Sequence, residues 1–171
     1  MRRLILMRHA KSSWDDPDQA DIDRPLNARG RLAAGLMGAW LAEEGLIPDH
    51  ALLSPARRVA ETWDRVAAAL GREATAATVP KLYHAAPEDA LAAMAKAPDG
   101  AQTLILIGHE PGATALLRRL SDGSEGGGCR RAYEKFPTAG VAVLEFDAKR
   151  WKDVAPTSGR FARFASPKDL V

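Results

Sequence analysis

The chain has 171 residues, of which 46% are hydrophobic and 27% charged, a composition typical of a globular protein that is long enough to bury a core. Its 24 positive and 22 negative residues give a formal net charge of +2, which argues against a nucleic-acid-binding protein or a membrane-surface protein. The single cysteine, Cys129, excludes an internal disulfide bond and a zinc site built from several cysteines.

Three short apolar runs, at 4–7, 51–53 and 103–107, predict buried strands. Each run is continuous rather than alternating, which is typical of a sheet covered on both faces. The first run ends at Arg8, too early for a signal sequence, and no stretch approaches the roughly 20 apolar residues of a membrane span. We therefore expect a cytoplasmic protein that forms one domain over residues 1–171 and makes no contact with a membrane.

The first helix is predicted to follow residue 27. Asn27 is a suitable N-cap, because its side-chain oxygen can accept a hydrogen bond from the first turn, and Gly45 provides a stop. Apolar residues recur at helical spacing between these two positions and predict the buried stripe of the helix, which consists of Leu32, Leu36, Met37, Trp40 and Leu41.

A second helix is predicted to begin at Ser54 and Pro55, with the serine as N-cap and the proline in the first helical position. Gly71 marks its end. Its inner face is predicted from helical spacing to comprise Val59, Thr62, Trp63, Val66 and Leu70. Ser54 is thereby interpreted as a helix cap and not as a nucleophile, because no serine-histidine-acid arrangement surrounds it.

The second half of the chain carries weaker patterns. Two shorter helices are expected after Pro87 and after Pro111. The glycine-rich segment 121–128 predicts a mobile loop, 140–146 predicts a strand, and the alternating segment 160–164 predicts an edge strand. Strands that alternate with helices favour parallel β-α-β units with right-handed crossovers. The fold class predicted is α/β, a three-layer α/β/α sandwich with a mostly parallel central sheet.

Chemically capable residues follow each of the three early strands directly. The first strand leads into Arg8 and His9, the second into 54–58 and the third into 108–112, which includes His109. The carboxyl ends of parallel strands lie along one edge of a sheet, so this topology brings the two histidines together with at least two arginines. Guanidinium groups and helix N-termini both favour phosphate.

Positive charge nearby lowers the pKa of an imidazole and keeps it neutral. A neutral imidazole beside a bound phosphoryl group can attack phosphorus, while arginines stabilise the charge on the other oxygens and water later hydrolyses the intermediate. The arginines supply the positive charge, and no histidine or acidic cluster has the spacing of metal ligands, so we expect neither a metal nor a cofactor.

Three motifs resemble those of the histidine phosphatase superfamily, which has the phosphoglycerate mutase-like fold. They are 8–10 (Arg-His-Ala), 54–62 (Ser-Pro-Ala-Arg-Arg-Val-Ala-Glu-Thr) and 108–112 (Gly-His-Glu-Pro-Gly). Within that superfamily, the short chain and the segments 23–30, 82–85 and 166–170 look most like the SixA-type phosphohistidine phosphatases. The resemblance spans nearly the whole chain, and the three motifs together are far more specific than any one of them.

The resemblance implies that His9 is the nucleophile that accepts the phosphoryl group. Arg8, Arg58 and His109 would complete the catalytic and substrate-binding pocket, with Arg58 rather than Arg57 matching the motif spacing. Arg24 would be a further phosphate ligand or a support for the loop after the first strand, where it could instead form a salt bridge with Asp21 or Asp23.

The chain departs from the family at the general acid. Many relatives have a glutamate in the segment that corresponds to 82–88, and no glutamate of this chain aligns with that position. His84 is the candidate proton donor; the alternatives are Asp15, Asp16, Asp23 and Glu88. An alkoxide leaving group needs a proton donor, whereas imidazole, with a pKa of about 6.5, departs more easily. A site without a carboxylic acid therefore favours protein phosphohistidine as the substrate.

Two other functions compete with this prediction. The same chemistry could act on a small-molecule phosphate ester, as a phosphatase or a mutase, or the pocket could bind phosphate without turnover. The partner class that the resemblance implies is a phosphorylated protein of a histidine kinase phosphorelay, such as a histidine phosphotransfer domain. No nucleic-acid partner is expected, and the oligomeric state is left open.

Overall fold

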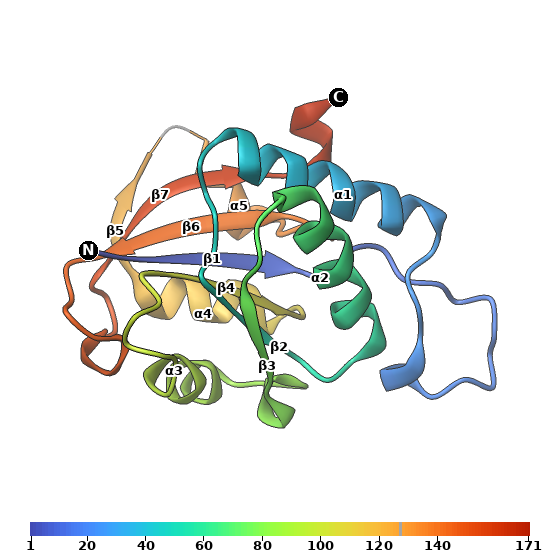
Figure 1. Ribbon diagram of the computed structural model, residues 1–171, viewed down its shortest axis with the longest axis horizontal. Coiled ribbons are helices and arrows are strands. Elements are labelled where there is room, and N and C mark those ends of the chain that lie inside the picture. The colour runs from blue at the N-terminus through green and yellow to red at the C-terminus, as the bar shows by residue number, and fades with distance from the viewer. Residues whose placement is uncertain (127) are drawn as a thin grey trace.

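Seven strands in the described part of the chain, residues 1–126 and 128–171 of the computed structural model, form one sheet in the order β3-β2-β4-β1-β6-β7-β5 (Figure 1). The strands are β1 (Arg2–Arg8), β2 (His50–Leu53), β3 (Thr75–Thr78), β4 (Thr103–Gly108), β5 (Ser121–Glu125), β6 (Val141–Phe146) and β7 (Gly159–Ala165). β3, β2, β4 and β1 are parallel, and β6 runs antiparallel to both β1 and β7.

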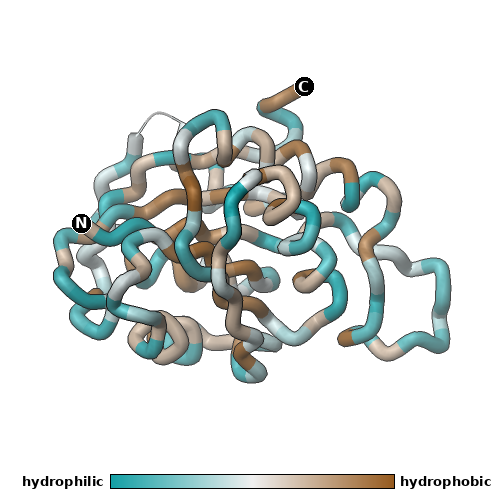
Figure 2. The backbone as a smooth tube through the Cα atoms, in the orientation of Figure 1, coloured by the Kyte–Doolittle hydropathy of each residue, from teal (hydrophilic) through white to brown (hydrophobic). Residues whose placement is uncertain are grey.

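Helices cover both faces of the sheet, as the continuous apolar strands predict. Leu4 and Leu6 of β1 belong to the core under α3 (Pro87–Ala95) and α4 (Gly112–Leu120), whereas Ile5 and Met7 belong to the core under α1 (Ala28–Glu43) and α2 (Arg57–Leu70). Figure 2 shows hydrophobic residues concentrated in the central strands. The three-layer α/β/α sandwich with a mostly parallel sheet is therefore confirmed. No helix in the described ranges is long and apolar enough to cross a membrane.

Helix α1 begins where its cap predicts, and Met37 and Leu41 of the predicted stripe are fully buried. The Asn27 side chain accepts a hydrogen bond from the Gly30 N–H, and Gly45 has a positive φ just beyond the helix. Leu32, predicted to be buried, is 77% exposed. The buried positions are Gly30, Ala34, Met37, Gly38 and Leu41. A Cβ on Gly38 would lie 2.9 Å from the Ala69 Cβ, so a small residue at position 38 allows the close packing of α1 on α2.

Helix α2 starts two residues later than the predicted proline position, and its N-cap is Ala56. The prediction of Ser54 as N-cap is therefore wrong. Its Oγ accepts a 3.3 Å hydrogen bond from Ala56 N–H, outside the helix, and also lies close to His109. The inner face of α2 is buried as predicted, and Gly71 ends the helix in the left-handed conformation.

Two predictions for the C-terminal third need correction. Residues 121–125, predicted as part of a mobile loop, form β5, and Gly127 of that loop lies outside the described residues. Segment 160–164 is not at an edge, because β7 lies between β6 and β5. β5 is the strand at that edge. Its backbone groups pair with β7, whereas the glycine-rich sequence predicted a loop. The other edge strand, β3, has no counterpart in the predicted elements.

Candidate active site

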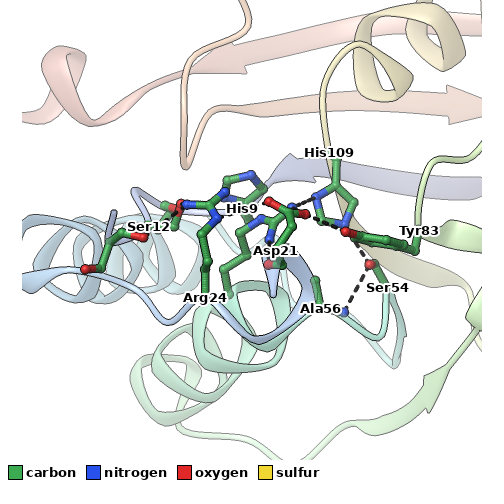
Figure 3. A network of polar contacts seen from close by, with 11 residues as sticks. His9, Ser12, Asp21, Arg24, Ser54, Ala56, Tyr83 and His109 are labelled. Atoms are coloured by element: carbon green, nitrogen blue, oxygen red, sulfur yellow. Dashed lines mark hydrogen bonds and ion pairs between the residues drawn. The ribbon is translucent and has the colours of Figure 1, made fainter. Parts of the chain in front are cut away.

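His9 and His109 lie side by side at the carboxyl ends of β1 and β4. The parallel register pairs Arg8 with Gly108, and the His9 N–H donates to the Gly108 carbonyl over 3.0 Å. The centroids of the two imidazole rings are 5.3 Å apart. Figure 3 shows both rings facing the side chains of the loop after β1. The strand topology thus brings together two residues that are 100 positions apart in the sequence.

The hydrogen bond that His9 makes fixes the role of each ring nitrogen. Nδ1 lies 2.7 Å from the Ala10 carbonyl oxygen, which can only accept, so Nδ1 carries the proton and Nε2 keeps its lone pair. His9 is 7% exposed. Burial, reinforced by the charges of Arg58, His109 and Arg8, lowers the pKa of His9 to about 3. The ring is therefore neutral at physiological pH, with an unprotonated nitrogen.

His109 is held from two sides. Arg58 Nη2 donates to its Nδ1 over 3.3 Å, and its Nε2–H donates to Ser54 Oγ over 2.7 Å. Because a guanidinium only donates, these two contacts select the tautomer with the proton on Nε2. Burial and the charge of Arg58 lower the pKa of His109 to about 4, so this ring is also neutral.

The two pocket arginines present hydrogen-bond donors to this space. Arg58, from the first turn of α2, is 5% exposed, and Arg8 ends β1 and donates from Nη1 to the Phe136 carbonyl over 3.0 Å. The buried Nε atoms of Arg8 and Arg58 have no hydrogen-bond partner in the described part of the chain. Buried donors without partners cost free energy.

Arg24 supports the loop after β1. It is 7% exposed, and its guanidinium donates from Nε to Asp21 Oδ1 over 3.0 Å, and from Nη1 to Ser12 Oγ over 2.6 Å and to the Ser13 carbonyl. The ring of the exposed Trp14 stacks on it, with 3.5 Å between the guanidinium carbon and the ring centroid. Three roles were predicted for Arg24. The contacts support two of them, the support of the loop and the salt bridge with Asp21.

Asp21 is a site residue that the sequence suggested only as a partner of Arg24. It lies in the 3-10 turn η1 (Asp21–Asp23), and its Oδ2 accepts from Arg58 Nη2 over 3.1 Å and from the Tyr83 hydroxyl. The hydrogen bond from Tyr83, together with both arginines, holds the pKa of Asp21 well below its usual range. The same hydrogen bond raises the pKa of Tyr83. An ionised carboxylate therefore already contacts the arginines of the pocket.

Tyr83 and Ser54 are site residues that the sequence reasoning missed. The Tyr83 ring meets the His109 ring edge-on with the centroids 5.5 Å apart. Tyr83 lies in the segment 82–85 that resembles the SixA type, but nothing local marks the tyrosine as a partner of a residue 62 positions away. Ser54 follows β2 directly, as the histidines follow β1 and β4, and that position is the signal that could have identified it.

In the described part of the chain, none of the candidate proton donors forms a hydrogen bond with His9 or His109. His84 is exposed, has a positive φ, stacks on Tyr83 and lines an apolar cavity of about 370 Å³ next to His109. Glu88 pairs with Arg119, and Glu110, beside His109, accepts from the N–H and hydroxyl of Thr114. In residues 1–126 and 128–171, Asp21 is the only carboxylate that hydrogen-bonds to Arg8, His9, Arg58 or His109.

No group of three or more histidine, cysteine, aspartate or glutamate side chains is arranged to hold a metal ion in the described ranges.

The model of the histidine phosphatase superfamily (branch 1) matches residues 4–83. An uncharacterized protein of Mycobacterium tuberculosis is 39% identical over 164 residues, which are 95% of this chain and 100% of that protein. The phosphohistidine phosphatase SixA of Escherichia coli is 26% identical, with 85% of this chain and 86% of that protein covered. A solved structure from Nakamurella multipartitia, provisionally named phosphohistidine phosphatase SixA, has a TM-score of 0.81 and 30% identity, with 97% and 96% of the two chains covered.

The likenesses to the two curated proteins and to the solved structure cover between 85% and 97% of this chain. The segment that the family model matches contains His9 and Arg58, and the likeness to the solved structure extends well beyond that segment. This chain therefore belongs to the histidine phosphatase superfamily and, within it, to the SixA type.

Proposed function

We propose that this phosphatase removes the phosphoryl group from phosphohistidine in a protein and carries it transiently on His9. The observation that carries the proposal is the hydrogen bond from His9 Nδ1 to the Ala10 carbonyl, which leaves Nε2 as a neutral nucleophile. His9 faces the guanidinium of Arg58 and the imidazole of His109 in a buried pocket, and the Arg8 guanidinium at the end of β1 adds positive charge.

The reaction proceeds in two displacements. His9 Nε2 forms a bond to phosphorus while the phosphorus–nitrogen bond of the substrate breaks, and the substrate histidine leaves as neutral imidazole when its other ring nitrogen carries a proton. Water then attacks phosphorus, the bond to His9 breaks, and orthophosphate is released. Arg8 and Arg58 stabilise the charge on the other phosphoryl oxygens in both steps, and His109 joins them when its Nε2–H donates to a phosphoryl oxygen in place of Ser54 Oγ, so the protein itself supplies the positive charge that the reaction requires.

The state of the acidic groups supports phosphohistidine over an alkyl phosphate. Asp21 is the carboxylate in contact with the pocket, and Arg58, Arg24 and Tyr83 hold it ionised. An ionised carboxylate cannot donate a proton, and an alkoxide leaves poorly without one, whereas imidazole leaves without such help. A histidine phosphotransfer domain of a phosphorelay is the partner class that the proposal implies, which would place the reaction in the cytoplasm.

A labelling experiment tests the proposal. A protein phosphorylated on histidine with ³²P is mixed with the wild-type chain and with His9→Asn, and the reaction is stopped within milliseconds. We expect an acid-labile label on the peptide that contains His9 in the wild type, none in His9→Asn, and a loss of turnover of at least about 10³-fold in that variant. Label on another residue, or turnover of an alkyl phosphate at the same rate or faster, would overturn it.

The apolar cavity beside His109 favours one alternative. Its volume of about 370 Å³ could accommodate the organic part of a small phosphate ester, with His84 at its wall as proton donor. In that case His84→Asn would lower turnover of an alkyl phosphate by about 10²-fold, since general acids contribute roughly 10²–10⁴-fold. The same substitution would leave phosphohistidine hydrolysis unchanged if our proposal holds.

A further inference from the structure

A second concave surface lies next to the candidate active site and is not used by the chemistry proposed above. It has a volume of about 340 Å³ and lies between the N-terminal turns of α1, the segment that follows α5 (Arg131–Glu134), and the C-terminal 3-10 helix η4 (Pro167–Leu170). We call it the basic groove; its cationic lining comprises Lys11, Arg29, Lys135 and Lys168, and its apolar lining includes Pro137 and Phe164.

The groove has an excess of positive charge. Its four cations named above are exposed, and none of them forms an ion pair within residues 1–126 and 128–171. A fifth cation, Arg131, is neutralised by Asp169 through two hydrogen bonds of 2.9 and 2.7 Å. Glu134 is the one carboxylate among the described lining residues. A chain with a net charge of only +2 thus gathers unpaired cations in one concave place.

The groove and the histidine pocket share a wall. Lys11 follows His9 by two residues, and its carbonyl accepts from the Asn27 N–H at the start of α1. On the other side, the Ala139 N–H lies 3.0 Å from the His9 carbonyl and 3.1 Å from the Arg8 carbonyl. Residues 137 and 138, which line the groove, directly precede Ala139. A chain whose phosphoryl group is at His9 can therefore extend over this wall into the groove.

We propose that the basic groove binds an acidic segment of the phosphorylated protein, close to its phosphohistidine; this rests on the function proposed above and specifies its substrate class. Carboxylates of the segment would pair with Lys11, Lys135 and Lys168, and an apolar side chain would pack on Phe164. The concave shape suits a polypeptide segment better than the flat surface of an anionic membrane. Attraction of this kind raises the association rate and weakens with salt.

The test uses charge reversal with a matched control. Lys135→Glu/Lys168→Glu reverses two charges in the groove, and Lys149→Glu/Lys152→Glu reverses two exposed lysines beyond β6, at the opposite end of the sheet. Two fluorescein-labelled peptides with a central histidine serve as probes, one with glutamates and one with serines on both sides. Binding is measured by fluorescence anisotropy, and hydrolysis of phosphoramidate reports the active site.

We expect the glutamate peptide to bind at least about tenfold more tightly than the serine peptide at low salt. The groove variant should lose this preference and the control variant should keep it, with phosphoramidate hydrolysis unchanged in both. Equal binding of the two peptides, or an equal loss of the preference in both variants, would overturn the proposal that the groove binds an acidic segment. Adsorption to phosphatidylserine vesicles that depends on Lys135 and Lys168, without peptide preference, would reassign it to a membrane.

The two proposals fail in different ways. If the glutamate peptide binds in the groove but its phosphohistidine form is not hydrolysed, the proposed role of the groove is supported and the proposed function is wrong. If the phosphohistidine forms of both peptides are hydrolysed with equal kcat/KM and neither charge reversal changes that value, the proposed function is supported and the proposed role of the groove is wrong.

Discussion

Nη2 of Arg58 lies 3.3 Å from Nδ1 of His109 and 3.1 Å from Oδ2 of Asp21, so one guanidinium joins the second histidine to the carboxylate of the loop after β1. Because the guanidinium can only donate, it fixes the proton of His109 on the opposite nitrogen. Arg58 thus both charges the pocket and orients the ring that faces His9.

The neighbouring arginines 57 and 58 allow a matched comparison of this role. Arg58 is buried in the pocket, whereas Arg57 is exposed and pairs with Glu61. We expect Arg58→Ala to lower kcat/KM for phosphoramidate by about 10²–10³-fold, the usual effect of removing a donor that stabilises transition-state charge. Arg57→Ala should change it less than about twofold, since exposed ion pairs contribute little. Similar losses in both variants would refute the assignment of Arg58 to the pocket.

Ser54 is expected to act as a positioning residue through His109. Without the Oγ that accepts from Nε2–H, the ring is held only by Arg58, which still keeps the proton on Nε2. Ser54→Ala should lower kcat about tenfold, corresponding to one lost hydrogen bond, and should move the ¹⁵N and ¹H shifts of the His109 Nε2–H group, which loses its acceptor. Ser13→Ala, which removes a hydroxyl from the exposed loop, is the control. Unchanged ring shifts in Ser54→Ala would limit the serine to packing.

Asp21 places negative charge where a phosphate dianion must bind. Asp21→Asn removes that charge and keeps one oxygen that can accept from Arg24 or Arg58. Charges about 4 Å apart repel by roughly 1 kcal/mol where water screens them, so inhibition by orthophosphate should become about fivefold tighter. The inhibition constant at pH 7 measures this effect. Weaker inhibition would mean that Asp21 chiefly holds the arginines in place.

Acid should unfold the protein partly through His9 and His109, whose pKa values are lowered in the folded chain. In the unfolded chain an imidazole has a pKa of about 6.5, whereas the folded values of His9 and His109 are lowered to about 3 and about 4. Between these values the unfolded chain binds protons that the folded chain does not. The free energy of unfolding therefore falls as pH decreases below about 6.5, by at most about 1.4 kcal/mol per pH unit for each histidine.

Urea unfolding of the wild type and of His9→Asn from pH 8 to pH 4.5 measures this dependence. At pH 8 both histidines are neutral in either state, so the difference there gives the packing cost of the substitution alone. The curve of His9→Asn should be shallower below pH 6.5. Parallel curves would show that His9 takes up a proton as readily in the folded protein as in the unfolded chain.

Two glycines of α1 should respond oppositely to alanine. A Cβ on Gly30 would lie 2.0 Å from the Lys11 carbonyl oxygen, whereas a Cβ on Gly35 would meet nothing within 4 Å. Gly30→Ala should destabilise the protein by about 1–3 kcal/mol through overpacking and lower activity, because Lys11 follows His9. Gly35→Ala should stabilise it by about 0.5–1 kcal/mol through helix propensity. Equal effects on urea midpoints would contradict this packing.

Local patterns in the sequence were sufficient for the sheet interior and for the meeting of the two histidines. Continuous apolar runs mark β1, β2 and β4 as strands buried on both faces, and the parallel topology then brings the residues after them to one edge. The placement of His9 beside His109 follows from these two facts, whereas Arg58 was predicted in place of Arg57 from the resemblance to the family motif.

Only the tertiary structure decided which groups touch these residues. The residues around Ser54 predict a helix cap, whereas its contact with His109 depends on where the chain leaves β2. The hydrogen bond from Tyr83 to Asp21 joins segments with no periodicity in common, and β5 exists because β7 offers its backbone groups. Strands, caps and turns depend on neighbouring residues, so the sequence alone determined them. Contacts between distant segments depend on the shape of the packed chain, so only the tertiary structure decided them.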